Sequence, residues 1–325
     1  MKPTLAHRAG FASLLSTLAI AVGCGGPANA RLDGYASAAL DSPANLSRFL
    51  FADARALGGS VQALLNLANP PAGTTCPMLT VSGNTRTLIG GCTDAMGRTW
   101  GGSLTLVTDD AAGRRTLTLD RFDIPASMTC GTTPLVTHRV ISGRIVMTQT
   151  PLRDDFDIDV VTDYDEVNTM TCAVAPSTSA IRYAGSATRT STAMNAATTW
   201  NGSGRVGSSP VGVASVATAN EVTDVAACQH EPASGLFRVS SGPNTAEITY
   251  DGATTCTTPP VATWTFNAMP RGNIQIGCNA RPGHTPGGEA AIALSLATLA
   301  LVSRRSRIRR ARHGQNMQHD RHARE

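Results

Sequence analysis

The sequence predicts a mainly β protein: an antiparallel sheet, sandwich or barrel of about ten strands, with a short N-terminal helical segment and stabilising disulfides. From about residue 73 the composition shifts to Thr, Ser, Val and Gly. Short runs of alternating apolar and polar residues recur there between Gly, Pro and Asn breaks, and no helical period separates them. Strands joined by short polar connections pair antiparallel. The pattern does not choose between sandwich, single sheet and barrel.

The helical segment is expected within residues 31–72. Ser42 is placed to cap a helix that has Pro43 at its first position. Apolar residues then recur at helical spacing, at Leu46, Phe49, Leu50, Ala54 and Leu57. We expect Gly58-Gly59 to stop this helix and Val61–Ala68 to form a second helical turn.

The β-rich core is expected over residues 73–276. The low apolar content of Ser186–Ser209 predicts a long loop there, or a boundary between two β lobes. The clearest strands are Ser103–Thr108, Arg115–Leu119, Val136–Thr148, Phe156–Thr162, Ala180–Ala184, Val211–Ala217, Leu236–Ser240, Ala246–Tyr250, Ala262–Phe266 and Asn273–Ile276.

The N-terminal residues 1–30 have the pattern of a secretory signal peptide. Basic residues precede the apolar run Phe11–Val22. Two cleavage sites compete. Ala28-Asn29-Ala30 fits the general signal peptidase, whereas Ala21-Val22-Gly23-Cys24 resembles a lipobox that lacks the usual Leu and would leave a lipidated Cys24. Either site predicts export.

The C-terminal residues 277–325 combine Gly277-Cys278, a spacer, the apolar run Ala290–Val302 and six arginines. The run has 13 residues, fewer than the roughly 20 that span a bilayer. Arginines after it would hold that end in the cytoplasm and leave Cys278 outside. The alternative interpretation of this C-terminal segment is a buried core helix followed by a disordered basic tail. The arginines are Arg304, Arg305, Arg307, Arg309, Arg310 and Arg312.

This order of Gly-Cys, apolar helix and arginines resembles the MYXO-CTERM sorting signal of exported myxobacterial surface proteins. The resemblance implies that residues after Cys278 are removed and that Cys278 carries the lasting attachment. It makes the envelope export and sorting machinery the expected partner. The chain departs from the pattern in its long spacer and in the polar tail after the arginines. The core, with CTD near Gly97 and Tyr250-Asp251-Gly252, resembles only uncharacterised envelope proteins, and this resemblance brings no known activity with it.

The charge of the expected mature region differs from that of the whole chain. The full sequence carries +4, but residues 31–278 contain sixteen arginines, no lysine and twenty acidic residues, which leaves −4. A mildly acidic domain without a basic cluster lacks the positively charged surface that binds the phosphates of nucleic acids. We therefore expect no nucleic-acid partner, and contact with the membrane only through the processed termini.

Six cysteines remain in the core once Cys24 and Cys278 are assigned to processing. An even number in an exported chain predicts three disulfides. Fifteen pairings are possible, and the sequence does not choose among them. The absence of C-x-x-C argues against zinc and thioredoxin-like sites. Nearest-neighbour closure would pair Cys76 with Cys92, Cys130 with Cys172, and Cys228 with Cys256.

The best chemical lead is the acidic run that starts at Asp154. Asp155, Asp157 and Asp159 should share one face of a strand. With Glu166 twelve positions in, they mimic the start of an EF-hand calcium loop, but Val160 stands where that loop needs Gly. The competing interpretation is a solvated acidic face that protects a strand edge. Apart from this possible Ca²⁺, no cofactor is expected.

No catalytic motif occurs in the chain. Gly202–Gly207 fits G-x-G-x-x-G but lacks the preceding strand and following helix. The core histidines are His138 and His230, and either would need two carboxylates in a closed pocket to indicate an enzyme. The first expectation is a non-enzymatic, surface-anchored structural or interaction protein with an unknown ligand. The alternatives are a secreted hydrolase or metal-dependent enzyme, and a lipid or glycan carrier, which would need a roomy apolar interior.

Overall fold

The computed structural model describes residues 27–71, 73–168, 170–193, 195–224, 226–228, 232–250 and 261–276. The expected processing sites Cys24, Gly277 and Cys278 lie outside the described residues, as do His230 and Cys256.

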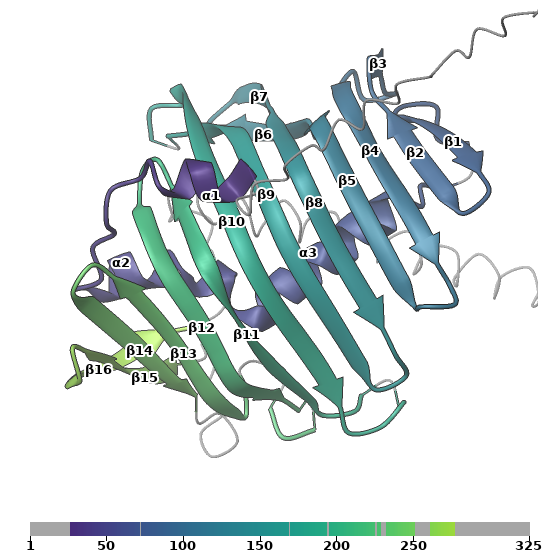
Figure 1. The fold of residues 1–325 in the computed structure, drawn as a ribbon. Coiled ribbons are helices and arrows are strands. Elements are labelled where there is room, and N and C mark those ends of the chain that lie inside the picture. Colours follow the sequence, from purple (N-terminus) through teal and green to yellow (C-terminus); the bar gives the residue numbers. More distant parts are fainter. Residues whose placement is uncertain are drawn as a thin grey trace, which may run out of the picture.

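One large antiparallel sheet of fourteen strands dominates the fold (Figure 1). The mainly β prediction is therefore confirmed, and of the three architectures the chain adopts a single sheet. Its order runs from β1 at one end to β16 at the other, mostly in sequence, with β3 paired to β4 and the hairpin β6–β7 apart. The strands are β1 (Met78–Ser82), β2 (Thr85–Ile89), β3 (Cys92–Thr93), β4 (Thr99–Asp109), β5 (Arg114–Asp123), β6 (Ala126–Cys130), β7 (Thr133–Thr137), β8 (Arg139–Gln149), β9 (Arg153–Val167), β10 (Val174–Arg189), β11 (Thr198–Ser208), β12 (Gly212–Thr223), β13 (Ser234–Ser241), β14 (Asn244–Tyr250), β15 (Val261–Phe266) and β16 (Met269–Gln275).

The expected loop or lobe boundary at Ser186–Ser209 is wrong for most of its length. Residues 198–208 form β11, which pairs with β10 on one side and β12 on the other. Its apolar content is low because Tyr183 of β10 occupies the space above it. A Cβ at Gly202 would lie 2.4 Å from the Tyr183 hydroxyl oxygen. Glycines thus make room for an aromatic ring from the neighbouring strand, and a strand results where the local sequence predicts a loop.

The helical segment is confirmed, but its limits differ from those expected. The helix α2 (Pro43–Ser47) begins at the predicted cap, where Ser42 Oγ accepts a hydrogen bond from the Asn45 N–H at 3.2 Å. A 3₁₀ turn, η1 (Leu50–Ala52), follows, and Asp53 caps a second helix, α3 (Ala54–Leu67).

The expected stop at Gly58-Gly59 is wrong, because α3 continues through both glycines. Gly58 lies against the sheet, where a Cβ would come within 2.6 Å of the Trp200 ring. The glycine therefore lets the helix approach the strands closely. Packing of the helix on the sheet outweighs the roughly 1 kcal/mol helix penalty of each glycine.

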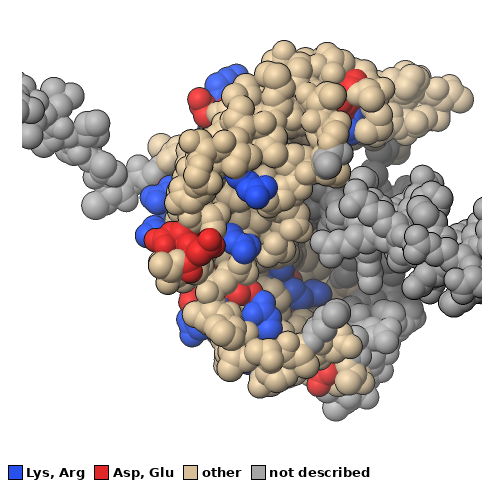
Figure 2. Space-filling model, turned by 90° about the vertical axis from the view of Figure 1, so that its right-hand side faces the viewer, with Lys and Arg blue, Asp and Glu red and all other residues tan. Residues whose placement is uncertain are grey.

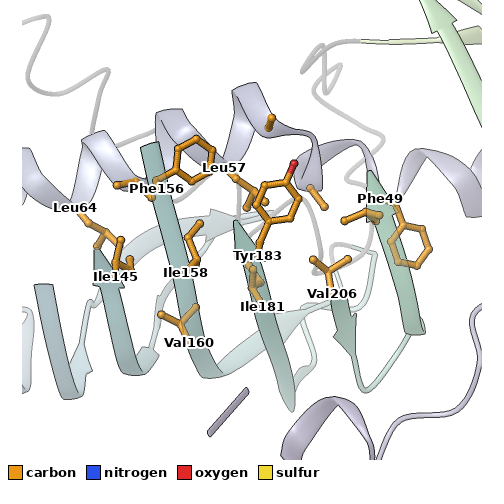
Figure 3. Packing of buried hydrophobic residues seen from close by; sticks show 14 of the residues in the cluster. Phe49, Leu57, Leu64, Ile145, Phe156, Ile158, Val160, Ile181, Tyr183 and Val206 are labelled. Carbon is orange, nitrogen blue, oxygen red and sulfur yellow. The ribbon is translucent and has the colours of Figure 1, made fainter. Parts of the chain in front are cut away.

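Helix α3 crosses one face of the sheet and closes the main core. Leu57 and Leu64 of α3 project toward Ile145 and Ile158 of the strands beneath (Figure 3). Phe156 and Tyr183 stack next to them with ring centroids 6.1 Å apart.

Helix α1 (Pro27–Leu32) lies on the opposite face of the sheet (Figure 1). Ala28 and Leu32 are fully buried and form a small apolar cluster with Ala180 of β10. The Ala28 N–H also donates to Asp159 Oδ1 at 3.1 Å. Residues 27–30, which the sequence assigns to a signal peptide, therefore belong to a packed helix.

Two predicted disulfides are confirmed. Cys76 is bonded to Cys92 and Cys130 to Cys172. Cys228 is also disulfide-bonded, and its expected partner Cys256 lies outside the described residues. Within those residues, no helix is long and apolar enough to cross a membrane.

Candidate ligand cavity beside helix α3

A cavity lies between α3 and the inner face of β8, β9 and β10. The cavity is small, with a volume of about 40 Å³, which is room for a few water molecules. Helix α3 contributes one stripe, spaced at three and four residues, and the strands contribute mostly isoleucine and valine. The lining residues are Phe51, Leu57, Ser60, Val61, Leu64, Arg139, Ile141, Ile145, Ile158, Val160, Thr162 and Ile181.

Arg139 is the charged residue in this apolar lining. It is the first residue of β8 and faces Tyr164 of β9 in the strand register. Its Nε is buried and has no hydrogen-bond partner among the residues that the structure describes. Burial lowers the pKa of Arg139 to about 10, and the neighbouring Tyr164 opposes that shift. The guanidinium therefore stays cationic at neutral pH in an environment that does not solvate it fully.

The N-terminal end of α3 is fixed to the sheet by a polar cluster of four residues, Asp53, Arg55, Thr218 and Glu221. Thr218 Oγ1 accepts the Ala54 N–H at 2.9 Å. Arg55 Nε donates to Glu221 Oε1 at 2.9 Å, and its NH2 lies 3.8 Å from Asp53 Oδ2. Both carboxyl groups are almost completely buried, with 4% and 0% of the side chains exposed.

One cation between two buried carboxyl groups determines their protonation. The pKa of Glu221 is raised to about 8, because burial and then the neighbouring Asp53 raise it by more than Arg55 lowers it. Burial likewise raises the pKa of Asp53, against Arg55 and the Ala56 N–H. Glu221 Oε2 has no hydrogen-bond partner within the described residues. Both buried carboxyl groups therefore have raised pKa values, and the single cation of Arg55, which lies closer to Glu221 than to Asp53, offsets the burial of only one negative charge.

The acidic residues proposed as calcium ligands do not converge. Asp155, Asp157 and Asp159 lie on the outer face of β9 as expected, with Phe156, Ile158 and Val160 buried on the other face. Their carboxylates are engaged one by one, by Arg153, by Arg182 and by the Ala28 N–H respectively.

Glu166 belongs to the opposite alternation of β9, and its carboxylate accepts from Ser177 Oγ at 2.8 Å. Asp159 and Glu166 are seven residues apart along an extended strand, which corresponds to about 24 Å. No group of three or more metal-ligating side chains occurs in the described parts of the chain. A calcium ion at these four residues stays a prediction that the geometry does not support.

His138 lies between β7 and β8 and meets two aspartates in different ways. Its Nδ1 is 2.8 Å from Asp123 Oδ2, whereas its backbone N–H donates to Asp165 Oδ2 at 2.8 Å. The side chain is 43% exposed. Among the residues that the structure places, one carboxylate reaches the imidazole ring and the position is open, so these residues do not form the arrangement expected of an enzyme at His138.

The conspicuous segment CTDAMGRTW forms a turn held by Asp94. The carboxylate accepts from the N–H groups of Met96 and Arg98, from the Arg98 side chain and from Trp100 Nε1. Burial alone would raise the pKa of Asp94, but these hydrogen bonds lower it well below the usual range. The motif therefore has a structural role.

The sequence reasoning missed both the cavity and the polar cluster. Arg139 carried a usable signal, because strand alternation places it on the same face as the buried Ile141. Asp53 and Glu221 come from distant parts of the chain, and no local pattern connects them. No known protein family matches the chain, and neither a curated protein nor a solved structure matches it.

Proposed function

We propose that the protein is exported, anchored at the cell surface and binds a ligand without transforming it. The disulfides carry this proposal. All five cysteines in the described part of the core are disulfide-bonded, namely Cys76, Cys92, Cys130, Cys172 and Cys228. Disulfides persist in oxidising compartments and are rare in the cytosol. This supports a location outside the cytoplasm.

The distribution of surface charge favours one class of ligand over another. On the face shown in Figure 2, acidic and basic side chains are scattered among neutral ones. We therefore infer recognition of a weakly charged ligand rather than of a highly charged polymer.

Helix α1 favours one of the two signal-cleavage sites. A cut after Ala30 would remove Ala28, which is fully buried and donates a hydrogen bond to Asp159. A cut before Cys24 would keep α1 whole and leave Cys24 available for a lipid anchor. The resemblance to the MYXO-CTERM signal adds a second attachment at Cys278. These termini account for the proposed anchoring.

The mature mass and surface labelling of the native protein test this proposal. We expect a chain that begins at a lipidated Cys24, ends close to Cys278 and is labelled on intact cells by an antibody against the folded core. An N-terminus at Arg31 would contradict the argument from α1. An intact C-terminus on surface-exposed protein would contradict sorting at Cys278, and reduced cysteines in protein from cells would contradict export.

A further inference from the structure

A groove lies at the C-terminal end of α3, where Leu65 and Asn69 face the inner side of β1, β2, β4 and β5. Its volume is about 340 Å³, within the range of roughly 300–1,000 Å³ that small-molecule sites have. The cavity farther back along α3 measures only about 40 Å³. Most residues that line the groove are exposed, so a ligand can enter it from solvent.

Two arginines project into this groove from strands on either side of β4. In the strand register, Arg86 of β2 lies opposite Leu106 of β4. Arg115 of β5 lies opposite Thr108, two residues farther along β4. Directly opposed residues share a face of the sheet, and Leu106 is buried on the face toward α3. Two strand spacings and two residues separate the Cα atoms of the arginines, or about 12 Å, so a ligand between them can contact both guanidinium groups.

The charges in the groove sum to one positive charge. Asp110, in the turn between β4 and β5, contributes the one carboxylate among the lining residues. Within the described part of the chain, neither this carboxylate nor Arg86 nor Arg115 takes part in an ion pair. A guanidinium binds a planar carboxylate through two parallel hydrogen bonds. The groove therefore matches a ligand with a single carboxylate.

Neutral polar groups surround these charges and are held in place by the backbone. Asn84 Nδ2 donates to the Thr108 carbonyl oxygen at 2.8 Å. Asn69 Nδ2 donates to the Leu65 carbonyl oxygen at 2.9 Å. The amide oxygens of both asparagines and the Thr108 hydroxyl can form further hydrogen bonds. These groups suit a ligand that carries hydroxyl groups next to its carboxylate.

We propose that the groove at the C-terminal end of α3 binds a uronic acid, a sugar with one carboxylate. The carboxylate lies between Arg86 and Arg115, and the hydroxyl groups meet Asp110 and the two asparagines. The proposal rests on the binding role proposed above and names its ligand class. A neutral sugar would leave both guanidinium groups without an anion, and inorganic phosphate would leave the neutral polar groups unused.

The test is an NMR titration of the purified disulfide-bonded protein with galacturonate, galactose and inorganic phosphate. We expect galacturonate to bind roughly 10-fold or more tightly than galactose, since a charge-assisted hydrogen bond contributes that much. The double substitution Arg86→Met and Arg115→Met should bring the two sugar affinities close together. Arg114→Met is the matched control and should leave the preference unchanged, because Arg114 is exposed and alternates to the opposite face of β5.

Four results would overturn the proposal: no binding of galacturonate, equal affinity for galactose, tighter binding of phosphate, or a preference for galacturonate that survives in the double variant. Circular dichroism establishes that each variant is folded. If the double variant does not fold, Val81→Phe, which fills the groove from β1 and retains both arginines, should abolish galacturonate binding. Binding that persists in Val81→Phe would also overturn the proposal. Its failure leaves export and surface anchoring to the mass and labelling measurements.

Discussion

The two ends of helix α3 are attached to the sheet by different physical means. At its N-terminal end, the half-exposed Arg55 and the buried carboxyl groups of Asp53 and Glu221 form a polar cluster whose geometry is fixed by hydrogen bonds. Farther along, Val61 and Leu64 contact an apolar cavity. One helix can therefore be fixed in position at one end and tolerate side-chain substitution farther along. Directional polar contacts specify its position, whereas an incompletely filled apolar space can accommodate a larger side chain.

The largest effect is expected from removing the cation of the polar cluster. Arg55→Met leaves Asp53 and Glu221 buried without their shared partner and should lower the free energy of unfolding by about 3–5 kcal/mol at neutral pH. Urea denaturation measures this loss. Arg144→Met is the control and should change stability by less than about 0.5 kcal/mol. Equal effects of the two substitutions would show that the cluster does not anchor α3.

The second effect is a pH dependence. The pKa of Glu221 is raised to about 8 in the folded protein, above about 4.3 in an unfolded chain. The folded state therefore holds the extra proton between these values, so stability falls as pH rises through this window, by at most about 1.4 kcal/mol per pH unit. Glu221→Gln cannot lose the proton and should show a smaller decrease. Parallel slopes for the two proteins would show that the titration of Glu221 does not cause this pH dependence.

A third prediction compares the cavity with the filled core. Val61→Ile adds a methylene into the cavity and should raise the free energy of unfolding by about 0.5–1 kcal/mol. The same change at Val206, which is fully buried on β11, should lower it by about 1–3 kcal/mol through overpacking. Thermal and urea denaturation test both. If both substitutions changed the free energy of unfolding in the same direction, the cavity at Val61 and the filled core at Val206 would not differ in packing.

The smallest effect is expected on the outer acidic face. Asp157 pairs with Arg182 while half exposed, so Asp157→Asn should alter stability by less than about 1 kcal/mol. Calcium chloride should shift the melting temperature no more than sodium chloride at equal ionic strength. A calcium-specific rise that disappears in Asp157→Asn would establish a metal site there.

Sequence reasoning succeeded where a local period determines the structure. The alternation around Ile158 placed the aspartates on the outer face of β9, and Ser42 marked a helix start, because both patterns depend on neighbours along the chain. It failed at β11 and at Gly58, where aromatic rings from other elements occupy the space that a side chain would need. The pairing of Asp53 and Glu221 with Arg55 was also invisible, since their proximity depends on the completed sheet.

The two end strands of the described sheet have a consequence for assembly. Strand β16 contains Pro270, which has no N–H to offer, and the cationic Arg271. Strand β1, at the other end of the described strand order, carries no charge, and Met78 and Val81 are 50% and 60% exposed. At high concentration, copies of the chain should therefore join first through β1, and a lysine in place of Val81 should suppress that self-association.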